Sequence, residues 1–381
     1  MKLKKVDLKV NKNNLKNNQK LEFGNIIMEQ SKNEFKVNQN LKYKLSRKKY
    51  IFYFSLGFAF MALIAMTLYL FVPLFYRTGV ESGEVWSETQ EFSLDYTVQL
   101  EKDSTKDFVV LNLADVQIID FDLFNGKYDK TIALITKLIA DKQPDLITLT
   151  GDNVAGGKNI LVIQHFIKFI DSFDIPWAPV MGNHDNDGLG DYNWVADMMI
   201  NTENCVMKKG LSDMGCGNYV ITIMENDTIV QALIMMDSHD SEVLNNQQDW
   251  YSWVVNGLDE VAGYSVDSTV MLHIPLFEYS EAWDYWVASD YDENIGSGER
   301  NETVCCSDTS NGFFALIKAL GSTKNIVCGH DHINDYSILY EGVRLTYAVK
   351  SGYTSYYNED ILGGTVLHIS TTELNIEQYI I

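Results

Sequence analysis

The stretch PDLITLTGDN, residues 144–153, indicates how this chain folds. It opens with a proline, continues as a short run of apolar and β-branched residues, and closes with Gly151 and Asp152. A short apolar run bounded by turn residues is typical of a strand that is buried in a sheet. A carboxylate directly after such a strand would lie at the sheet edge where α/β proteins place their binding loops.

The same arrangement recurs along the chain from about residue 107 onward. Further apolar runs end in polar residues at DFVVLNLADVQ (107–117), PWAPVMGNHD (176–185), IVQALIMMDSHD (229–240), STVMLHIP (268–275) and KNIVCGHDH (324–332). Between the first of these runs, residues 129–143 and 160–173 have apolar residues at helical spacing. Strands that alternate with helices predict an α/β domain, and the last 40 residues read as antiparallel strands joined by glycine-containing turns.

Side chains that bind metals follow these predicted strands. In chain order they are Asp115, Gln117, Asp152, Asn183, His184, His273, His330, Asp331 and His332. The segment CGHDHIND, residues 328–335, could by itself be a polar turn, but four of the chain's seven histidines belong to this set. Because strand ends of one sheet edge meet in space, we expect a single site.

The residue types in this set indicate a metal centre. Carboxylates, imidazoles and amide oxygens suit Mn, Fe or Zn without any thiolate. One carboxylate can bridge two ions about 3.5–4 Å apart, and such a pair can clamp an in-line displacement. Glycines precede Asp152, Asn183 and His330, which allows the backbone to turn sharply beside the ions.

The order of these motifs resembles that of a known family. The pattern D-x-Q…GD-N…GNHD…H…GHDH, from Asp115 to His332, resembles the signature of the calcineurin-like metallophosphoesterases over residues 107–381. GHDHINDYS (329–337) and LTYAVKSGYTSYYNEDILGGT (345–365) are similar to Dcr2-type phosphatases and to the purple-acid-phosphatase-29-like branch. The resemblance implies a four-layer α/β sandwich, in which two mixed β-sheets are flanked by α-helices.

The resemblance also implies roles for individual residues. One ion would be held by Asp115, Gln117, Asp152 and His332, and the second by Asp152, Asn183, His273 and His330. His184 would act as the catalytic acid, with Asp185 orienting it. The expected reaction is metal-dependent hydrolysis of a small-molecule or protein phosphoester, with a phosphomonoester as the first choice. The alternatives are a phosphodiesterase or nucleotide pyrophosphatase, and a metal-binding surface protein without turnover.

Two positions depart from the family's patterns. Gln117 stands where the family usually has histidine, so we expect a weaker first metal site, or one that prefers Mn. Manganese-dependent ADP-ribose/CDP-alcohol phosphatases also carry glutamine there. Ala155 stands where purple acid phosphatases have a tyrosine ligand, so we expect no iron–tyrosinate colour.

An apolar segment, residues 50–75, contains no charged residue. Its 26 residues would span roughly 39 Å as a helix, more than the ~30 Å hydrocarbon core of a membrane. A cleaved signal peptide fits less well, because the apolar run is long and some 49 residues precede it. Five basic residues lie between Lys42 and Lys49, whereas Arg77 is the only one close on the other side. The positive-inside rule therefore predicts a single-pass plasma-membrane protein with a cytoplasmic N-terminus and an extracellular or lumenal catalytic domain.

The charge distribution completes the expected domain plan. The first 50 residues carry 14 Lys and Arg against 4 Asp and Glu, although the chain's net charge is −22. The acidic remainder lacks a basic stripe for nucleic acid. We expect a disordered basic tail over 1–48, which could instead lie on anionic lipid. A transmembrane helix over 49–76, an acidic stalk over 77–104 and the catalytic domain over 105–381 would follow.

Several further residues allow two readings. Cys205 and Cys216 could form a disulfide in an oxidising compartment, and an odd total of five cysteines leaves at least one free thiol. His239 is either structural or part of the cleft. The aromatic segment 279–293 either stacks a substrate base or sugar, or packs onto its own domain. Arg300, Arg344 and Lys350 are candidates for holding a substrate anion.

Overall fold

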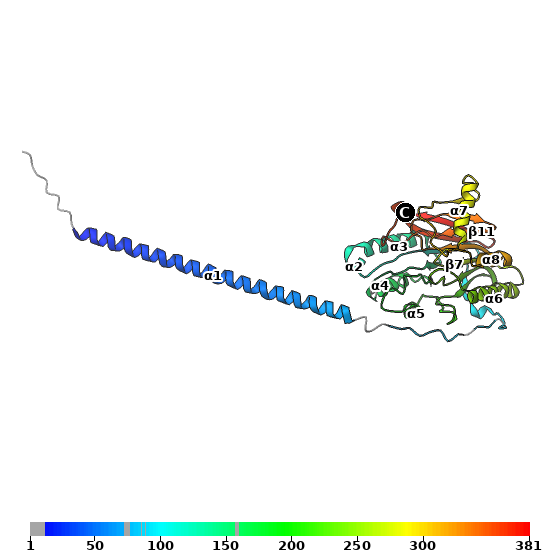
Figure 1. Cartoon of the computed structure of the whole chain (residues 1–381), viewed down its shortest axis with the longest axis horizontal. Coiled ribbons are helices and arrows are strands. Elements are labelled where there is room, and N and C mark those ends of the chain that lie inside the picture. Colours follow the sequence, from blue (N-terminus) through cyan, green and yellow to red (C-terminus); the bar gives the residue numbers. More distant parts are fainter. Residues whose placement is uncertain (1–11, 72–76, 85, 88, 157–159) are drawn as a thin grey trace, which may run out of the picture. The chain divides into compact units, whose positions relative to one another are not determined.

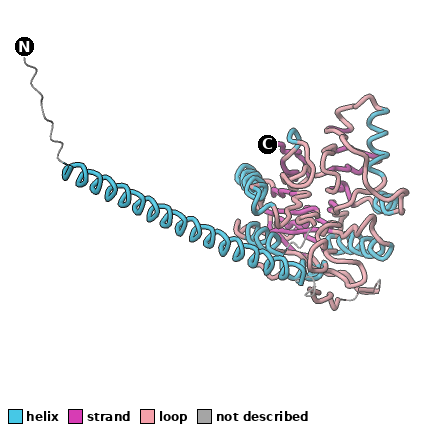
Figure 2. Tube along the Cα trace, turned by 60° about the vertical axis from the view of Figure 1, so that its left-hand side comes forward, coloured by secondary structure: helices cyan, strands magenta, loops and turns pink. Residues whose placement is uncertain are grey.

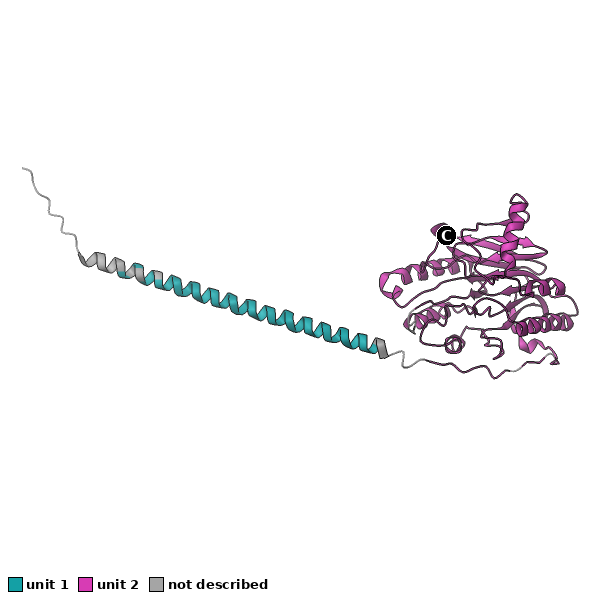
Figure 3. Ribbon diagram, in the orientation of Figure 1, with its two compact units in different colours: residues 1–75 teal, residues 76–381 magenta. Residues whose placement is uncertain are grey.

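The computed structural model describes residues 12–71, 77–84, 86–87, 89–156 and 160–381. The chain divides into two compact units, residues 1–75 and 76–381 (Figure 3). Each unit is described by itself below.

The described residues of the first unit form one long helix, α1 (Lys12–Phe71). The stretch Ile27–Leu68 is long and apolar enough to cross a membrane, and its mean hydropathy reaches 2.1 over 18 residues. A membrane anchor and a signal sequence share this character. The disorder expected over 1–48 is wrong for 12–48, which continue the helix, while residues 1–11 and 72–76 lie outside the described residues. Lys, Gln, Glu and Leu are good helix formers, and extending an existing helix costs far less than nucleating one.

The second unit contains two mixed β-sheets. The larger has the order β1 (Val98–Glu101), β5 (Tyr219–Glu225), β6 (Thr228–Met235), β7 (Ser268–Met271), β9 (Thr323–Cys328), β11 (Val343–Tyr347), β10 (Ser337–Tyr340) and β8 (Gly296–Ser297). The smaller has the order β13 (Leu374–Ile380), β12 (Gly363–Ile369), β2 (Phe108–Leu113), β3 (Leu146–Thr150) and β4 (Trp177–Val180). β2, β3 and β4 run parallel to one another, as do β6, β7 and β9. The carboxyl ends of each parallel group therefore share one edge.

Helices cover the outer faces of both sheets (Figures 1 and 2). Those packed in the core of the smaller sheet are α3 (Lys127–Lys142), α4 (Ile160–Asp171) and α5 (Tyr192–Ile200), preceded by the short α2 (Asp122–Asn125). Those of the larger sheet are α6 (Asn245–Ala262), α7 (Glu278–Ala288) and α8 (Phe313–Leu320). The predicted apolar face of α3 is buried at Ile135, Leu138 and Ile139.

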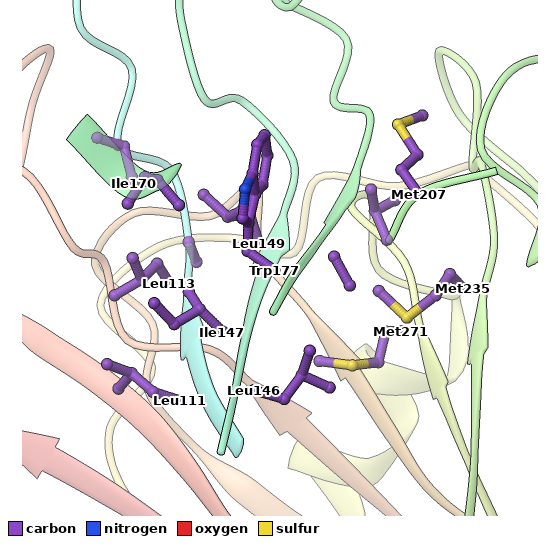
Figure 4. Packing of buried hydrophobic residues seen from close by; sticks show 14 of the residues in the cluster. Leu111, Leu113, Leu146, Ile147, Leu149, Ile170, Trp177, Met207, Met235 and Met271 are labelled. Atoms are coloured by element: carbon purple, nitrogen blue, oxygen red, sulfur yellow. The ribbon is translucent and has the colours of Figure 1, made fainter. Parts of the chain in front are cut away.

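A layer of apolar side chains fills the space between the two sheets (Figure 4). Leu146 of the smaller sheet lies toward Met235 and Met271 of the larger one (Figure 4), and all three are fully buried. Leu111, Leu113 and Ile147 lie on the other face of the smaller sheet, on the side of α4 (Figure 4). Each such side chain contributes about 1.5–3 kcal/mol when it is removed from water. The expected four-layer α/β sandwich is confirmed.

The segment 77–104, expected to be a stalk, is part of the folded unit instead. Arg77 N donates to Leu189 O at 2.8 Å, and Trp253 Nε1 donates to Gln90 O at 2.7 Å. Phe92 lies over α6 at Gly257, where an added Cβ would come within 2.2 Å of the phenyl ring. β1 then pairs with β5. The acidic composition of this segment led us to expect a stalk, but its aromatic side chains anchor it to the folded unit.

We expect Phe92→Ala to lower the free energy of unfolding by about 2 kcal/mol, because it removes a large side chain packed onto α6. Chemical denaturation of the detergent-solubilised chain measures this. Phe124→Ala is the matched control, since Phe124 is 78% exposed and its loss should change stability by less than about 0.5 kcal/mol. Equal effects of the two substitutions would contradict the packing described for residues 77–101.

Candidate metal centre

The predicted ligands lie in loops that follow the carboxyl ends of parallel strands. Asp115, Asp152 and Asn183 follow β2, β3 and β4 of the smaller sheet, while His273 and His330 follow β7 and β9 of the larger one. Short contacts connect all seven predicted ligands into one group. Both sheets therefore supply the site.

The first set of donor atoms contains Asp115, Asp152 and His332, whose ligand atoms lie within 4.8 Å of one another. His332 Nε2 is 3.7 Å from Asp115 Oδ1, and Gln117 Nε2 donates to Asp152 Oδ2 at 2.7 Å. Gln117 Oε1 is buried and has no hydrogen-bond partner among the described residues. A buried acceptor without a partner is costly, and a cation would relieve that cost.

The second set contains Asp152, His273 and His330, again within 4.8 Å of one another. His273 Nε2 lies 3.0 Å from Asn183 Oδ1, 3.3 Å from Asp152 Oδ1 and 3.2 Å from His330 Nδ1. His273 Nδ1 faces Thr150 O at 2.9 Å, which leaves Nε2 directed at the other donors. Asp152 belongs to both sets, which is the arrangement that a bridging carboxylate requires.

Backbone strain is concentrated at the same loops. Asp115, Gln117, Asp152 and His330 have φ angles of 51°, 46°, 50° and 77°, in the left-handed region that residues with a Cβ rarely adopt. The strain is held by hydrogen bonds, because His330 N donates to both carboxylate oxygens of Asp115 at 3.0 Å and Gln117 N donates to Asp152 O at 2.8 Å. Strained backbone of this kind clusters at functional sites.

Glycines make room for the ligands. An added Cβ at Gly182 would lie 2.2 Å from Asp152 N and 2.3 Å from Asp152 Oδ1. An added Cβ at Gly329 would lie 2.7 Å from Asp115 Oδ2. These distances are shorter than van der Waals contact, so the glycines noted in the sequence are required by the close packing of the loops.

The electrostatics of the site favour bound cations. Burial raises the pKa of Asp115 to about 6. Burial lowers the pKa of His273, but the carboxylates of Asp152 and Asp115 outweigh it and raise that pKa to about 10. Burial lowers the pKa of His330 to about 4 and that of His332 to about 3, so both imidazoles are neutral at neutral pH and offer lone pairs.

The donor set fits a pair of metal ions. It combines buried carboxylates, imidazoles and amide oxygens, including the unpaired Gln117 Oε1. Oxygen and nitrogen donors without thiolate suit Mn, Fe or Zn. The seven residues present are therefore compatible with the ions that the sequence predicts.

His184 lies at the rim of this site, but its partner differs from the expected one. Its backbone N donates to Asp152 Oδ1 at 2.9 Å, and its Nδ1 pairs with Asp187 Oδ2 at 2.7 Å. Asp185 instead accepts hydrogen bonds from Gly182 N at 2.8 Å and Asn153 N at 2.9 Å. The tight turn from Gly182 to Asp185 directs this carboxylate back into the protein. The i, i+3 spacing of His184 and Asp187 was the sequence signal for the observed pair.

Other residues singled out in the sequence lie elsewhere or serve the fold. Lys350 is buried and donates to Asp115 O at 2.5 Å, so it holds a ligand loop and does not face a substrate. His239 lines a separate pocket of about 200 Å³. In the segment 279–293, Trp283 packs on Trp286 with ring centroids 5.5 Å apart, as the packing interpretation expects. All five cysteines lie in the described residues and are free, Cys205 and Cys216 included.

Tyr356 was not singled out in the sequence. Its ring stacks on His332 with centroids 4.1 Å apart, and its carbonyl oxygen lies 3.0 Å from His332 Nδ1. These contacts leave His332 Nε2 directed at Asp115. No local pattern separates this tyrosine from its neighbours Tyr353 and Tyr357.

Comparison with known proteins gives the following similarities. A family model described as calcineurin-like phosphoesterase matches residues 108–337. "Probable inactive purple acid phosphatase 28" of Arabidopsis thaliana is 27% identical over 59% of this chain and 63% of its own length. "Phosphatase DCR2" of Saccharomyces cerevisiae is 25% identical over 55% of this chain and 39% of its own length. A dimetal phosphatase from Danio rerio superposes with a TM-score of 0.45 at 12% identity, covering 72% of this chain and 99% of that one.

The chain thus spans less than two thirds of the length of the first of these curated relatives.

We expect Gly182→Ala to reduce bound metal, because the new methyl group would displace the Asp152 carboxylate. Elemental analysis of the purified chain after metal loading measures this, with the melting temperature as a second readout. Gly83→Ala is the control, since an added Cβ there meets nothing within 4 Å. Full metal content in Gly182→Ala would show that Asp152 does not hold the ions.

Proposed function

This chain belongs to the calcineurin-like phosphoesterase family, and from that premise we propose that its strand-end site is a dinuclear centre that hydrolyses a phosphomonoester. The observation that carries the proposal is the position of Asp152, which belongs to both sets of donor atoms. A single carboxylate shared between two sets is what an in-line displacement clamped by two ions needs.

The proposed ligands divide into two groups. One ion would be held by Asp115, Gln117, Asp152 and His332, and the other by Asp152, Asn183, His273 and His330. When bound, ions of the Mn, Fe or Zn class supply Lewis acidity to the phosphate and to the attacking water. The chain's own contribution is to fix the donors at short range, since strained loops and close glycine contacts leave the ligands little freedom.

His184 is the proposed catalytic acid. Its side chain is 43% exposed, and its Nδ1 is engaged by Asp187. Nε2 is then available to give a proton to the leaving alcohol oxygen. Asp187 is the proposed orienting carboxylate, while Asp185 fixes the loop of Asn183 and His184 through its hydrogen bonds to backbone N–H groups.

A metal-binding protein without turnover is the second candidate. The names of the Arabidopsis relatives include "probable inactive", and Gln117 replaces an imidazole ligand with a weaker amide. Gln117 Nε2 already donates to Asp152, so the free Oε1 of Gln117 would be the atom that binds the ion. The remaining ligands and His184 favour turnover.

The proposed cellular arrangement follows from α1 and its flanks. The apolar part of this helix is preceded by Lys42, Lys44, Arg47, Lys48 and Lys49. This asymmetry supports a single-pass plasma-membrane anchor with the N-terminus in the cytoplasm. The catalytic unit would then act on phosphoesters outside the cell or in a lumen.

We expect the metal-stripped chain to regain phosphatase activity with Mn, Zn or Fe, and Asp152→Asn to remain inactive under each ion. The loss should exceed the roughly 10- to 100-fold that changes outside the ligand shell cost. Asp284→Asn, an exposed change on α7, is the matched control and should retain full turnover. Metal binding by the wild type without any turnover would favour the second candidate.

The preference for monoesters is tested by comparing chromogenic phosphomonoester and phosphodiester substrates under the activating metal. We expect higher kcat/KM for the monoester, in line with the phosphatase names of the relatives. A diester preference of about tenfold, worth about 1.4 kcal/mol in the transition state, would reassign the activity to a phosphodiesterase or nucleotide pyrophosphatase.

A further inference from the structure

A third group of donor atoms lies beside His330. Atoms of Cys305, His330 and Asp331 lie within 4.8 Å of one another. Cys305 is exposed and is not among the predicted ligands of the dinuclear centre. A cation in solvent can therefore reach this group without entering the centre.

The loop that carries Cys305 is fixed against the turn that carries His330. Cys305 N donates to Asp331 Oδ2 at 3.1 Å. Ile333 N donates to Glu302 Oε1 at 2.9 Å, and Glu302 N donates to Asn334 Oδ1 at 3.0 Å. Hydrogen bonds that cross between loop and turn in both directions hold the thiol close to the imidazole.

The carboxylate of Asp331 is held by hydrogen bonds through one of its oxygens. Asp331 is 3% exposed, and its Oδ2 accepts from both Cys305 N and Tyr347 Oη, the latter at 2.5 Å. Asp331 Oδ1 has no hydrogen-bond partner in the described part of the chain, and the same holds for Cys305 Sγ. Oδ1 and Sγ are therefore free to act as ligands to a cation that approaches from solvent.

The donor types decide the class of cation. Sulfur, imidazole nitrogen and carboxylate oxygen are the ligands of zinc sites, and three protein ligands leave a fourth position for water. Mg²⁺ and Ca²⁺ prefer all-oxygen sites and are not suited to a thiolate. The neighbouring Cys306 is placed differently, because its Sγ donates to Ser307 O at 3.3 Å.

We propose that Cys305, His330 and Asp331 form an additional site for Zn²⁺ or another thiophilic divalent cation at the mouth of the phosphoesterase centre. As the sulfur–metal bond forms, the thiol proton passes to solvent. The site shares His330 with the proposed dinuclear centre. A neutral imidazole has one lone pair, so a cation held there competes with the second ion for His330 and lowers turnover, a consequence that rests on the proposed function.

The binding test uses the full chain in detergent, stripped of metal and titrated with Co²⁺. Coordination by a thiolate produces a sulfur-to-cobalt charge-transfer band, which the thiolate-free dinuclear centre cannot produce. We expect the band in the wild type and in Cys306→Ser, and its loss in Cys305→Ser. A band that persists in Cys305→Ser, or its absence from the wild type, overturns the proposal.

Two further measurements separate this site from the proposed activity. Asp152→Asn should keep the charge-transfer band although it loses turnover, and loss of the band in that variant would mean that no independent site exists. In the active chain, Zn²⁺ added beyond the amount needed for activation should inhibit the wild type and Cys306→Ser but spare Cys305→Ser. Equal inhibition of the wild type and both variants would overturn the proposed effect on turnover. The charge-transfer band would still show whether Cys305 binds the cation.

Discussion

The constraint on which the site depends is the placement of one carboxylate, Asp152, at the junction of two sheets. It follows β3 of the smaller sheet, yet its Oδ1 lies 3.3 Å from His273, which follows β7 of the larger sheet. The apolar layer between the sheets fixes the distance between those strand ends. The geometry of the ligands therefore depends on the packing of the core, because any slip of one sheet over the other would separate the two sets of donor atoms.

The strained backbone of the ligand loops also depends on rigid packing around the site. Four ligand residues adopt left-handed φ angles, at a cost of order 1–2 kcal/mol each, and only a rigid surround can maintain them. Lys350 and Tyr356 belong to that surround, since they bind Asp115 O and His332 without taking part in the ligand set themselves. Lys350 is buried, and its ammonium group donates a hydrogen bond to this one carbonyl oxygen.

The sequence predicted the features that repeat or that depend on local pattern. The apolar runs ending in Asp115, Asp152 and His330 predicted parallel strands and a shared edge, and the helical spacing from Ile135 to Ile139 predicted the buried face of α3. It could not predict contacts between distant segments. Phe92 on Gly257 joins residues far apart in the chain, and the choice of Asp187 over Asp185 depends on the direction of one turn. The helix over residues 12–48 was missed because its polar composition lacks a periodic apolar face.

The pairing of β1 with β5 has a consequence for solubility. β5 is buried along all seven residues, so without β1 it would present apolar side chains and unpaired backbone groups to other molecules. β1 has four residues, buries only part of its surface and ends at Glu101, followed by Lys102, whose ammonium group pairs with Glu225 at 2.6 Å. A short strand closed by charged residues is a poor template for further pairing. The segment that carries β1 thus shields β5 from pairing with other chains, and a shortened form of the folded unit would need to retain it.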